Sequence, residues 1–316
     1  MNSPARAANS CGSRVSTIVI AQRMAQCGVN VGFRRATAPG HQAGRRGAEG
    51  SGRGRKDRAG GRVRLGLPVA TSADNPASPR KRHALELFEG LPRHYARAGA
   101  VMSFGQDPRW RRAMVTAVNP RLGQRVLDVA TGTGLVAFEL VRRGGCEVIG
   151  IDQSERMLAT AREQLTRDAA LAEHVTFQSG QAERLPFADN QFDALTFTYL
   201  LRYVDDRAAT MRELARVVAP GGRIGMVEFG VPAAAPLRAL WRVYTRVGLP
   251  LIGRLLSSAW CEVGRFLGPN IEQLYEQEPD LTALWRSAGI EQIRQRRMSF
   301  GAGVVMWGVK GGVGSA

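Results

Sequence analysis

The sequence predicts an α/β fold: a doubly wound, mostly parallel seven-stranded sheet that ends in a C-terminal antiparallel hairpin. From about residue 83, apolar strand-like runs alternate with amphipathic helical segments, the pattern of parallel strands joined by helices. A glycine-rich turn follows the first of these runs, as in folds that bind an adenosine-containing ligand there. The last two strand-like runs are joined by a very short link at Ser299–Gly301, so we expect them to pair antiparallel.

The first half of the domain alternates regularly. We expect strands at RVLDVA (125–130), CEVIGID (146–152) and HVTFQSG (174–180). The helix after the first strand places apolar residues on one face and stops at a Gly-Gly pair (144–145). The helix after the second strand, SERMLATAREQL (154–165), opens with Ser154, a good N-cap residue.

The second half continues this order and adds an irregular segment. A fourth strand is expected at FDALTFTYLL (192–201), then a helix ended by Pro220 and two glycines, then a fifth strand at RIGMVEFG (223–230). Residues 232–275 are expected to be mostly helical and irregular. The helix LTALWRSAG (281–289) then precedes the hairpin strands IEQIRQRRM (290–298) and GAGVVMWGVK (301–310).

The positive charge is concentrated in the N-terminal part of the chain. Of the net charge of +17, residues 1–82 carry +13 and residues 83–316 carry +4. Residues 1–82 are rich in Arg and Gly without an apolar period, so we expect a basic, disordered leader. Three explanations stay open: an RNA- or membrane-binding arm, an organellar transit peptide, and an over-extended reading frame whose true start is Val69. The near-neutral remainder argues against a nucleic-acid partner for the domain.

Other composition features exclude several classes of protein. No apolar stretch reaches the ~18 residues of a membrane-spanning helix. The four cysteines are scattered without a CxxC pair, which excludes a zinc ribbon and a disulfide scaffold and suits a reducing compartment. We therefore expect no metal site.

The turn after the first strand, DVATGTG (128–134), is the candidate cofactor loop. Gly132 and Gly134 allow close backbone approach to a ligand. Asp152, at the end of the second strand, can accept hydrogen bonds from two ribose hydroxyls. The glycines also fit G-x-G-x-x-A, so a nicotinamide or flavin cofactor stays open on this motif alone, as does a tight turn with an exposed acid.

Three later motifs favour one class. QAERLPF (181–187), DNQFD (189–193) and RVVAPGG (216–222) occur in a succession that resembles class I S-adenosylmethionine methyltransferases. The resemblance implies S-adenosylmethionine as the donor and a methyltransferase domain over 83–316. The residues it implies for donor binding are Asp128, Thr131, Gly132, Thr133, Gly134, Asp152, Gln153, Gln181, Ala182 and Thr198. Phe187 of the first motif has an equally good interpretation as a core residue.

Further segments are similar to a narrower family. MSFG (102–105), RWRR (109–112), LRYVD (201–205), VEF (227–229) with Pro232, LPLIG (249–253) and RFL (265–267) resemble the ubiquinone/menaquinone biosynthesis C-methyltransferases, which include demethylmenaquinone methyltransferases. Two positions depart from that family. Ala96 stands where an Asp is usual, and Leu200-Leu201-Arg202-Tyr203 stands where Gly-Leu-Arg-Asn is usual. Both departures fall near the expected acceptor.

The resemblance implies methyl transfer to a ring carbon of a quinol, most simply demethylmenaquinol to menaquinol, without a metal. It places Arg202 on the acceptor side. Because arginine is a poor base, we expect Arg202 to stabilise a developing phenolate. Tyr95 and Tyr199 are candidates to orient the ring. His94 and His174 are weaker candidates, and His174 starts a strand and is expected to be structural.

A lipophilic quinol suggests contact with a membrane surface. Residues 237–260, inside an expected helical lid at 232–275, mix apolar residues with four arginines, which suits peripheral, reversible membrane binding or an ordinary lid packed on the sheet. We expect a cytoplasmic protein, at the inner face of the membrane when bound, and an organellar one only if the leader is a transit peptide. A homodimer is left open.

The sequence leaves three alternative functions open. They are a methyltransferase for a soluble small molecule at O or N, an RNA methyltransferase, and a partner-binding pseudoenzyme.

Overall fold

The computed structural model describes residues 78–89, 91 and 95–312, so most of the expected leader lies outside the described residues. Helix α2 (Pro79–Glu89) begins four residues before the boundary expected at 83. Its Lys81 side chain is buried and lies 2.6 Å from Glu183. Residues 79–82 are therefore part of a packed helix.

The sheet confirms the predicted fold class. Seven strands lie in the order β3-β2-β1-β4-β5-β7-β6, and β7 is antiparallel to both of its neighbours. The bounds are β1 Arg125–Val129, β2 Glu147–Asp152, β3 Val175–Ser179, β4 Phe192–Thr198, β5 Val218–Phe229, β6 Ile290–Met298 and β7 Gly303–Lys310. A short 3-10 turn, Ser299–Gly301, joins β6 to β7 as expected.

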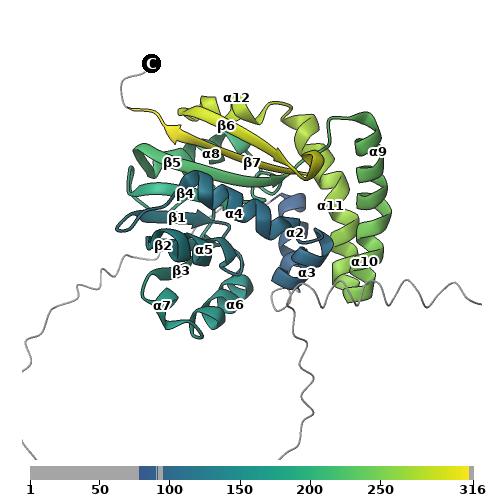
Figure 1. The fold of residues 1–316 in the computed structure, drawn as a ribbon, viewed down its shortest axis with the longest axis horizontal. Coiled ribbons are helices and arrows are strands. Elements are labelled where there is room, and N and C mark those ends of the chain that lie inside the picture. Colours follow the sequence, from purple (N-terminus) through teal and green to yellow (C-terminus); the bar gives the residue numbers. More distant parts are fainter. Residues whose placement is uncertain (1–77, 90, 92–94, 313–316) are drawn as a thin grey trace, which may run out of the picture. The chain divides into compact units, whose positions relative to one another are not determined.

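Helices cover both faces of the sheet (Figure 1). Between the sheet and these helices lie two apolar cores. One face carries α4 (Gln106–Val118), α5 (Leu135–Gly144) and α6 (Glu155–Leu165), with the short α7 (Ala169–Ala172) against α5 and α6. The other face carries α8 (Arg207–Arg216) and α12 (Leu281–Ser287). The Ser154 hydroxyl caps α6 by accepting the Met157 N–H, as predicted.

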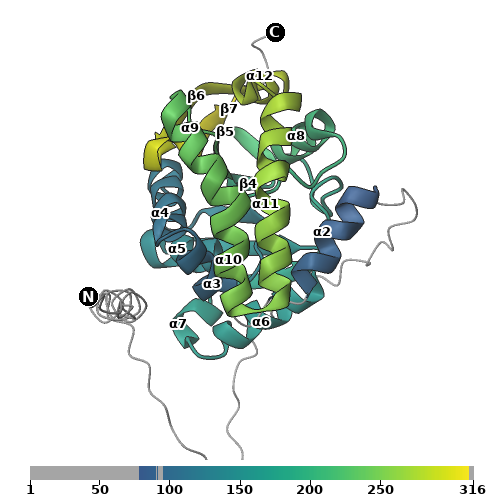
Figure 2. The same ribbon diagram turned by 90° about the vertical axis from the view of Figure 1, so that its right-hand side faces the viewer.

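A helical layer lies beyond the carboxyl ends of the parallel strands (Figures 1 and 2). It consists of α3 (Tyr95–Met102), α9 (Ala235–Val243), a π-helical turn at Tyr244–Gly248, α10 (Leu249–Leu256) and α11 (Ser258–Gln277). Gly264 and Gly268 lie one turn apart on α11, and a Cβ at either would come within 3.0 Å of Leu249 or Thr245. The two glycines let α11 pack closely on this neighbouring segment. The helical lid predicted at 232–275 corresponds to α9 through α11.

Two boundaries differ from the sequence prediction. β4 ends at Thr198 because Tyr199 has a φ of 57°, which a strand does not accommodate. α8 ends at Arg216, and β5 starts at Val218, before Pro220, with a register shift opposite β4. The prolyl and glycyl residues at 220–222 therefore lie inside an irregular strand and do not end the helix.

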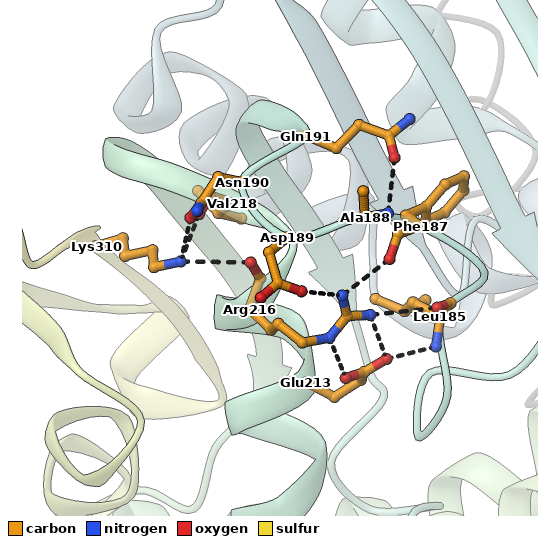
Figure 3. A network of polar contacts seen from close by, with 10 residues as sticks. All are labelled: Leu185, Phe187, Ala188, Asp189, Asn190, Gln191, Glu213, Arg216, Val218 and Lys310. Carbon is orange, nitrogen blue, oxygen red and sulfur yellow. Dashed lines mark hydrogen bonds and ion pairs between the residues drawn. The ribbon is translucent and has the colours of Figure 1, made fainter. Parts of the chain in front are cut away.

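A polar network fixes the long loop between β3 and β4 (Figure 3). Arg216, at the end of α8, donates to both carboxylate oxygens of Glu213, to Asp189 and to the carbonyl of Phe187. Glu213 in turn accepts the Leu185 N–H at 2.7 Å. The loop that follows β3 is thereby held against α8.

Candidate active site

A cavity of about 390 Å³ lies between the carboxyl ends of the central strands and the helical layer. Its floor is the loop after β1, the end of β2 and the residues after β4. Its cover comes from α3, the start of α4, and the α9–α11 segment. Polar groups gather at the β1–β2 end, and aromatic side chains dominate under the cover, namely Tyr95, Tyr199, Tyr203, Phe229, Trp241, Tyr244 and Trp260.

The glycine-rich loop takes a conformation that its sequence permits. Gly132 and Gly134 have φ values of 56° and 81°, and Ala130 also lies in the left-handed region at 54°. A Cβ at Gly134 would lie 2.8 Å from the rings of Phe138 and Phe177, whereas one at Gly132 would meet nothing within 4 Å. Gly134 therefore serves packing, and Gly132 presents bare backbone to the cavity.

Asp128 holds this loop from below. Its carboxylate is buried and accepts the hydroxyls of Thr131 at 2.6 Å and Thr196 at 2.7 Å. Burial raises the pKa of Asp128 to about 6, and the two hydroxyl bonds oppose that rise. Asp128 does not line the cavity, and its hydrogen bond to Thr131 positions the loop that does.

Asp152 lies at the rim of the loop and lines the cavity. One carboxylate oxygen accepts the Gly132 N–H at 2.8 Å, and the other accepts the Ser154 N–H at 2.9 Å. Burial raises the pKa of this carboxyl, while these backbone donors act against the rise. Each oxygen retains a further lone pair, which leaves two acceptors toward a vicinal diol.

Thr133 has a buried side-chain hydroxyl without a hydrogen-bond partner among the described residues. Its side chain is 2% exposed and lines the cavity. The lack of a partner is costly for a buried polar group unless a ligand supplies one. Gln153 and Thr198, both predicted to bind the donor, also line the cavity.

Two of the predicted donor-binding residues lie elsewhere. Gln181 is exposed and Ala182 is buried against the core, and neither lines the cavity. Both follow the sheet's β3 edge, and Gln181 pairs locally with Arg184. Phe187 packs edge-on against Phe192 at 4.9 Å between ring centres, which agrees with its interpretation as a core residue.

Arg202 lies at the aromatic end of the cavity and is nearly fully buried. Its Nε donates to Glu228 at 2.8 Å, and one terminal nitrogen donates to Asn270 at 2.9 Å and to the Tyr203 hydroxyl at 3.0 Å. The guanidinium also lies 5.1 Å from the centre of the Phe229 ring. Burial lowers the pKa of Arg202, but Glu228 more than offsets this and raises it, so Arg202 remains a cation.

Tyr199 and Tyr95 frame the same part of the cavity. The Tyr199 hydroxyl donates to Asp107, and its ring stacks on Phe229 at 4.4 Å. Its positive φ is uncommon for a bulky residue and marks a constrained position. Burial raises the pKa of Tyr95 to about 12 and that of Tyr199 well above its ordinary value, so both rings keep their protons.

Asp107 and Arg111 complete this group on the first turns of α4. Arg111 Nε lies 2.9 Å from the same Asp107 oxygen that accepts Tyr199, and both side chains are buried and line the cavity. Burial lowers the pKa of Arg111, but Asp107 beside it outweighs this and raises it. The pair is an internal ion pair beside the aromatic rings.

Sequence reasoning missed four residues of this side: Asp107, Arg111, Glu228 and Asn270. Asp107 and Arg111 have the i, i+4 spacing of a helical ion pair, but no helix was expected before residue 125. Glu228 lies at the end of a predicted buried strand, and a carboxylate there is a signal that it has a charged partner.

The remaining candidates lie away from the cavity or outside the described residues. His174 bonds Glu147 through Nδ1 at 2.7 Å near the surface, in agreement with a structural role. His94 lies outside the described residues. Within the described part of the chain, no group of three or more His, Cys, Asp or Glu side chains could hold a metal ion. Cys146 and Cys261 are buried and unpaired.

The comparisons agree with one family. Residues 78–310 match the ubiE/COQ5 methyltransferase family. The chain is 36% identical over 227 residues to the ubiquinone/menaquinone biosynthesis C-methyltransferase UbiE of Desulfotalea psychrophila, covering 71% of this chain and 89% of the relative. It is 35% identical over 220 residues to the demethylmenaquinone methyltransferase of Mycobacterium marinum, covering 70% and 90%. The Geobacter sulfurreducens UbiE is 33% identical over 228 residues, covering 72% and 88%.

Proposed function

The chain belongs to the ubiE/COQ5 methyltransferase family, and on that premise we propose that it transfers the methyl group of S-adenosylmethionine to a ring carbon of a lipophilic quinol, with demethylmenaquinol as the acceptor. It is an S-adenosylmethionine-dependent methyltransferase. The observation that carries the choice of acceptor is that this cavity has two chemically different ends. A glycine loop and an acid meet it on one side, and aromatic rings around a buried arginine meet it on the other.

The residues at the polar end fit the donor. Asp152 offers two carboxylate oxygens to the ribose hydroxyls, and the backbone at Gly132 offers room for close approach. The unpartnered hydroxyl of Thr133 requires a polar ligand atom beside it. S-adenosylmethionine supplies a methyl group that is already activated by a sulfonium charge, so the protein's task is to align acceptor and donor.

At the other end, Arg202 favours the ionised form of a phenol. Its raised pKa excludes it as a base, and a fixed cation in a buried site stabilises negative charge as it develops on the acceptor oxygen. Glu228 and Asn270 hold the guanidinium in place. Tyr199 and Phe229 stack beside it and provide an apolar wall for a flat ring.

The decisive experiment incubates the purified chain with labelled S-adenosylmethionine and demethylmenaquinol in mild detergent, followed by mass spectrometry. We expect menaquinone as the product, and we expect Arg202→Lys to lower kcat ~10²–10³-fold without changing donor affinity. If the donor binds but no quinol is methylated, the choice of acceptor is wrong.

A second candidate acceptor is a soluble phenol or amine. The departure at residues 200–203 favours it, because Leu200 and Tyr203 line the cavity at positions where the family has Gly and Asn. Ala96, the other departure, does not line the cavity. The Tyr203 ring stacks on Phe266 and bonds Arg202, so it occupies space beside the cation. Screening methyl transfer to small naphthols and catechols beside demethylmenaquinol separates the two candidates.

We also propose peripheral membrane contact through the α9–α10 segment, which would give a lipid-anchored quinol access to the cavity. This segment is apolar on two sides. Trp241, Thr245 and Leu249 face the cavity, while a row of large apolar side chains is exposed on it, namely Leu237, Leu240, Val243, Val247, Leu251 and Leu255. Arg238, Arg242, Arg246 and Arg254 lie on the same segment, and helices that combine an apolar face with basic residues suit binding at a membrane surface. No helix in the described part of the chain is long and apolar enough to cross a bilayer.

A further inference from the structure

The reaction proposed above releases a proton. The family resemblance names no good base among the residues of this chain that could receive that proton. A phenol attacks through its ring carbon only as its hydroxyl proton leaves. Arg202 and Arg111 hold their protons, and so do Tyr95 and Tyr199, because their pKa values are raised. No histidine is among the described residues that line the cavity.

Only two carboxylates are found among the described residues that line the cavity, Asp107 and Asp152. Asp152 is bound to the Gly132 and Ser154 amides at the donor end. Asp107 lies at the other end, in the group that contains Tyr95, Tyr199 and Arg111. It is 6% exposed, and its backbone N–H donates to Ser103 at 3.1 Å.

The contacts of Asp107 suit a base that works beside a flat ring. Arg111 and the Tyr199 hydroxyl both donate to its Oδ1, which fixes the carboxylate. A carboxylate accepts through two oxygens. Since Arg111 and Tyr199 both donate to Oδ1, the carboxylate keeps the capacity to accept a proton. Tyr199 stacks on Phe229 next to the Arg202 cation. A phenol lying on this wall would therefore lie between a cation and a carboxylate.

Resting on the proposed function, we infer that Asp107 is the proton acceptor of the methyl transfer. The acceptor's O–H bond breaks and its proton passes to the Asp107 carboxylate. The ring carbon next to that oxygen bonds the methyl group, and the S–CH₃ bond breaks with its electron pair going to sulfur. The ring C–H proton then leaves to water as the ring regains aromaticity, and Asp107 returns its proton to the oxygen. The net result is one methyl group gained and one proton released.

The test compares the full chain with Asp107→Asn over pH 6.5 to 10, using a short-chain demethylmenaquinol under anaerobic conditions. We expect the variant to lose about 10²–10³-fold in kcat at pH 7. We expect that deficit to shrink about tenfold per pH unit, because the quinol hydroxyl ionises by itself near the phenol value of ~10. Calorimetric affinity for S-adenosylmethionine should stay within about twofold, since Asp107 lies away from the donor loop.

Asp107→Asn leaves Arg111 buried without its carboxylate, so a second variant removes both charges. Asp107→Asn/Arg111→Gln should show the same loss and the same rescue at high pH. Glu163→Gln, which removes an exposed carboxylate that pairs with Arg167, is the control and should match the wild type throughout.

A deficit of equal size at every pH, in either variant, would show a merely structural role and overturn the inference. So would undiminished activity at pH 7. If the wild-type chain methylates no quinol at any pH, the proposed function itself has failed. The two failures are therefore distinguishable.

Discussion

The Thr133 hydroxyl is a buried polar group that the described residues leave without a partner. If the donor supplies that partner, Thr133→Val removes one hydrogen bond of about 0.5–1.5 kcal/mol from the complex. We expect the Kd for S-adenosylmethionine to rise ~2–13-fold, as measured by calorimetry. The unliganded protein should not lose stability, because the variant also removes the cost of an unpaired hydroxyl.

Thr116→Val is the matched control for that prediction. Thr116 is an exposed threonine on α4 whose hydroxyl donates to the Arg112 carbonyl. Its replacement should leave donor affinity unchanged. Equal affinities for Thr133→Val and the wild type would mean that the hydroxyl does not contact the donor.

Among individual residues, those of the site that lie close together in the sequence could be predicted from it. Gly132 and Gly134 lie in one turn, and Asp152 ends the adjacent strand, so a motif of about 25 residues forms the polar end of the cavity. Asp107 lines the cavity, and Glu228 lies behind it as the partner of Arg202. The two acids are separated by more than a hundred residues, and the packing of α4 against β5 brings them to the same region. Gln181 and Ala182 were placed from family resemblance, and the described cavity does not reach them.

At the scale of elements, the network around Arg216 joins α8 to the loop before β4 (Figure 3). Arg216→Ala removes a two-pronged pair with Glu213 and bonds to Asp189 and the Phe187 carbonyl. We expect a loss of about 1–3 kcal/mol in the free energy of unfolding, measured by urea denaturation at pH 7. Arg167→Ala, which breaks the exposed pair with Glu163, should cost less than about 0.5 kcal/mol.

The same network predicts a dependence on pH. Burial raises the pKa of Glu213, but the hydrogen bonds from Arg216 and from the Leu185 N–H outweigh it and hold the pKa below its ordinary value of 4.5. The stabilisation is therefore present above pH 4.5 and is lost as pH falls through the folded-state pKa. The difference in the free energy of unfolding between the wild type and Arg216→Ala should become smaller in acid. If that difference stays constant down to pH 3, the loss of stability is due to packing alone.

The exposed apolar row on α9–α10 is the second feature at this scale. Burying one leucine in a membrane is worth about 1.5–3 kcal/mol, so Leu240→Asp/Leu251→Asp should lower vesicle binding at least ~10-fold. Flotation with phosphatidylglycerol vesicles at about 0.5 M salt measures this, because the salt screens the basic leader. Leu122→Asp, at a still more exposed leucine before β1, should have no effect. Equal losses in both variants would remove the proposal.

On the scale of the whole molecule, the sheet order follows from alternation of strands and helices together with the short link at 299–301. The positions of the helices before β1 and the irregular start of β5 could not be predicted from the sequence, because they depend on contacts with distant elements. α2 places Lys81 against Glu183, and α4 packs on β5 and β7. α2 and α4 are rich in arginine and contain no glycine. α4 does carry a helical apolar period, since Trp110, Met114 and Val118 are all buried, so this helix could have been predicted from its sequence.

The distribution of charge gives the last prediction. Residues 1–68 contain 13 basic and two acidic residues, so a chain of residues 69–316 has a net charge of +6 instead of +17. All residues that line the cavity lie within 81–302. We expect the shortened chain to bind S-adenosylmethionine and to methylate detergent-solubilised quinol as the full chain does. The shortened chain should bind RNA much more weakly, because the electrostatic part of the affinity grows with the number of phosphates that the protein neutralises.

Fluorescence anisotropy with a labelled RNA at several salt concentrations measures the second part. The full chain should show a steep linear fall of log affinity with log salt, and the shortened chain a shallow one, because each phosphate contact contributes about 0.7 to the slope for a single strand. Equal slopes would place the RNA-binding charge in the domain and revive RNA as an acceptor. A loss of methyl transfer on shortening, with donor binding retained, would instead make the first 68 residues part of acceptor recognition.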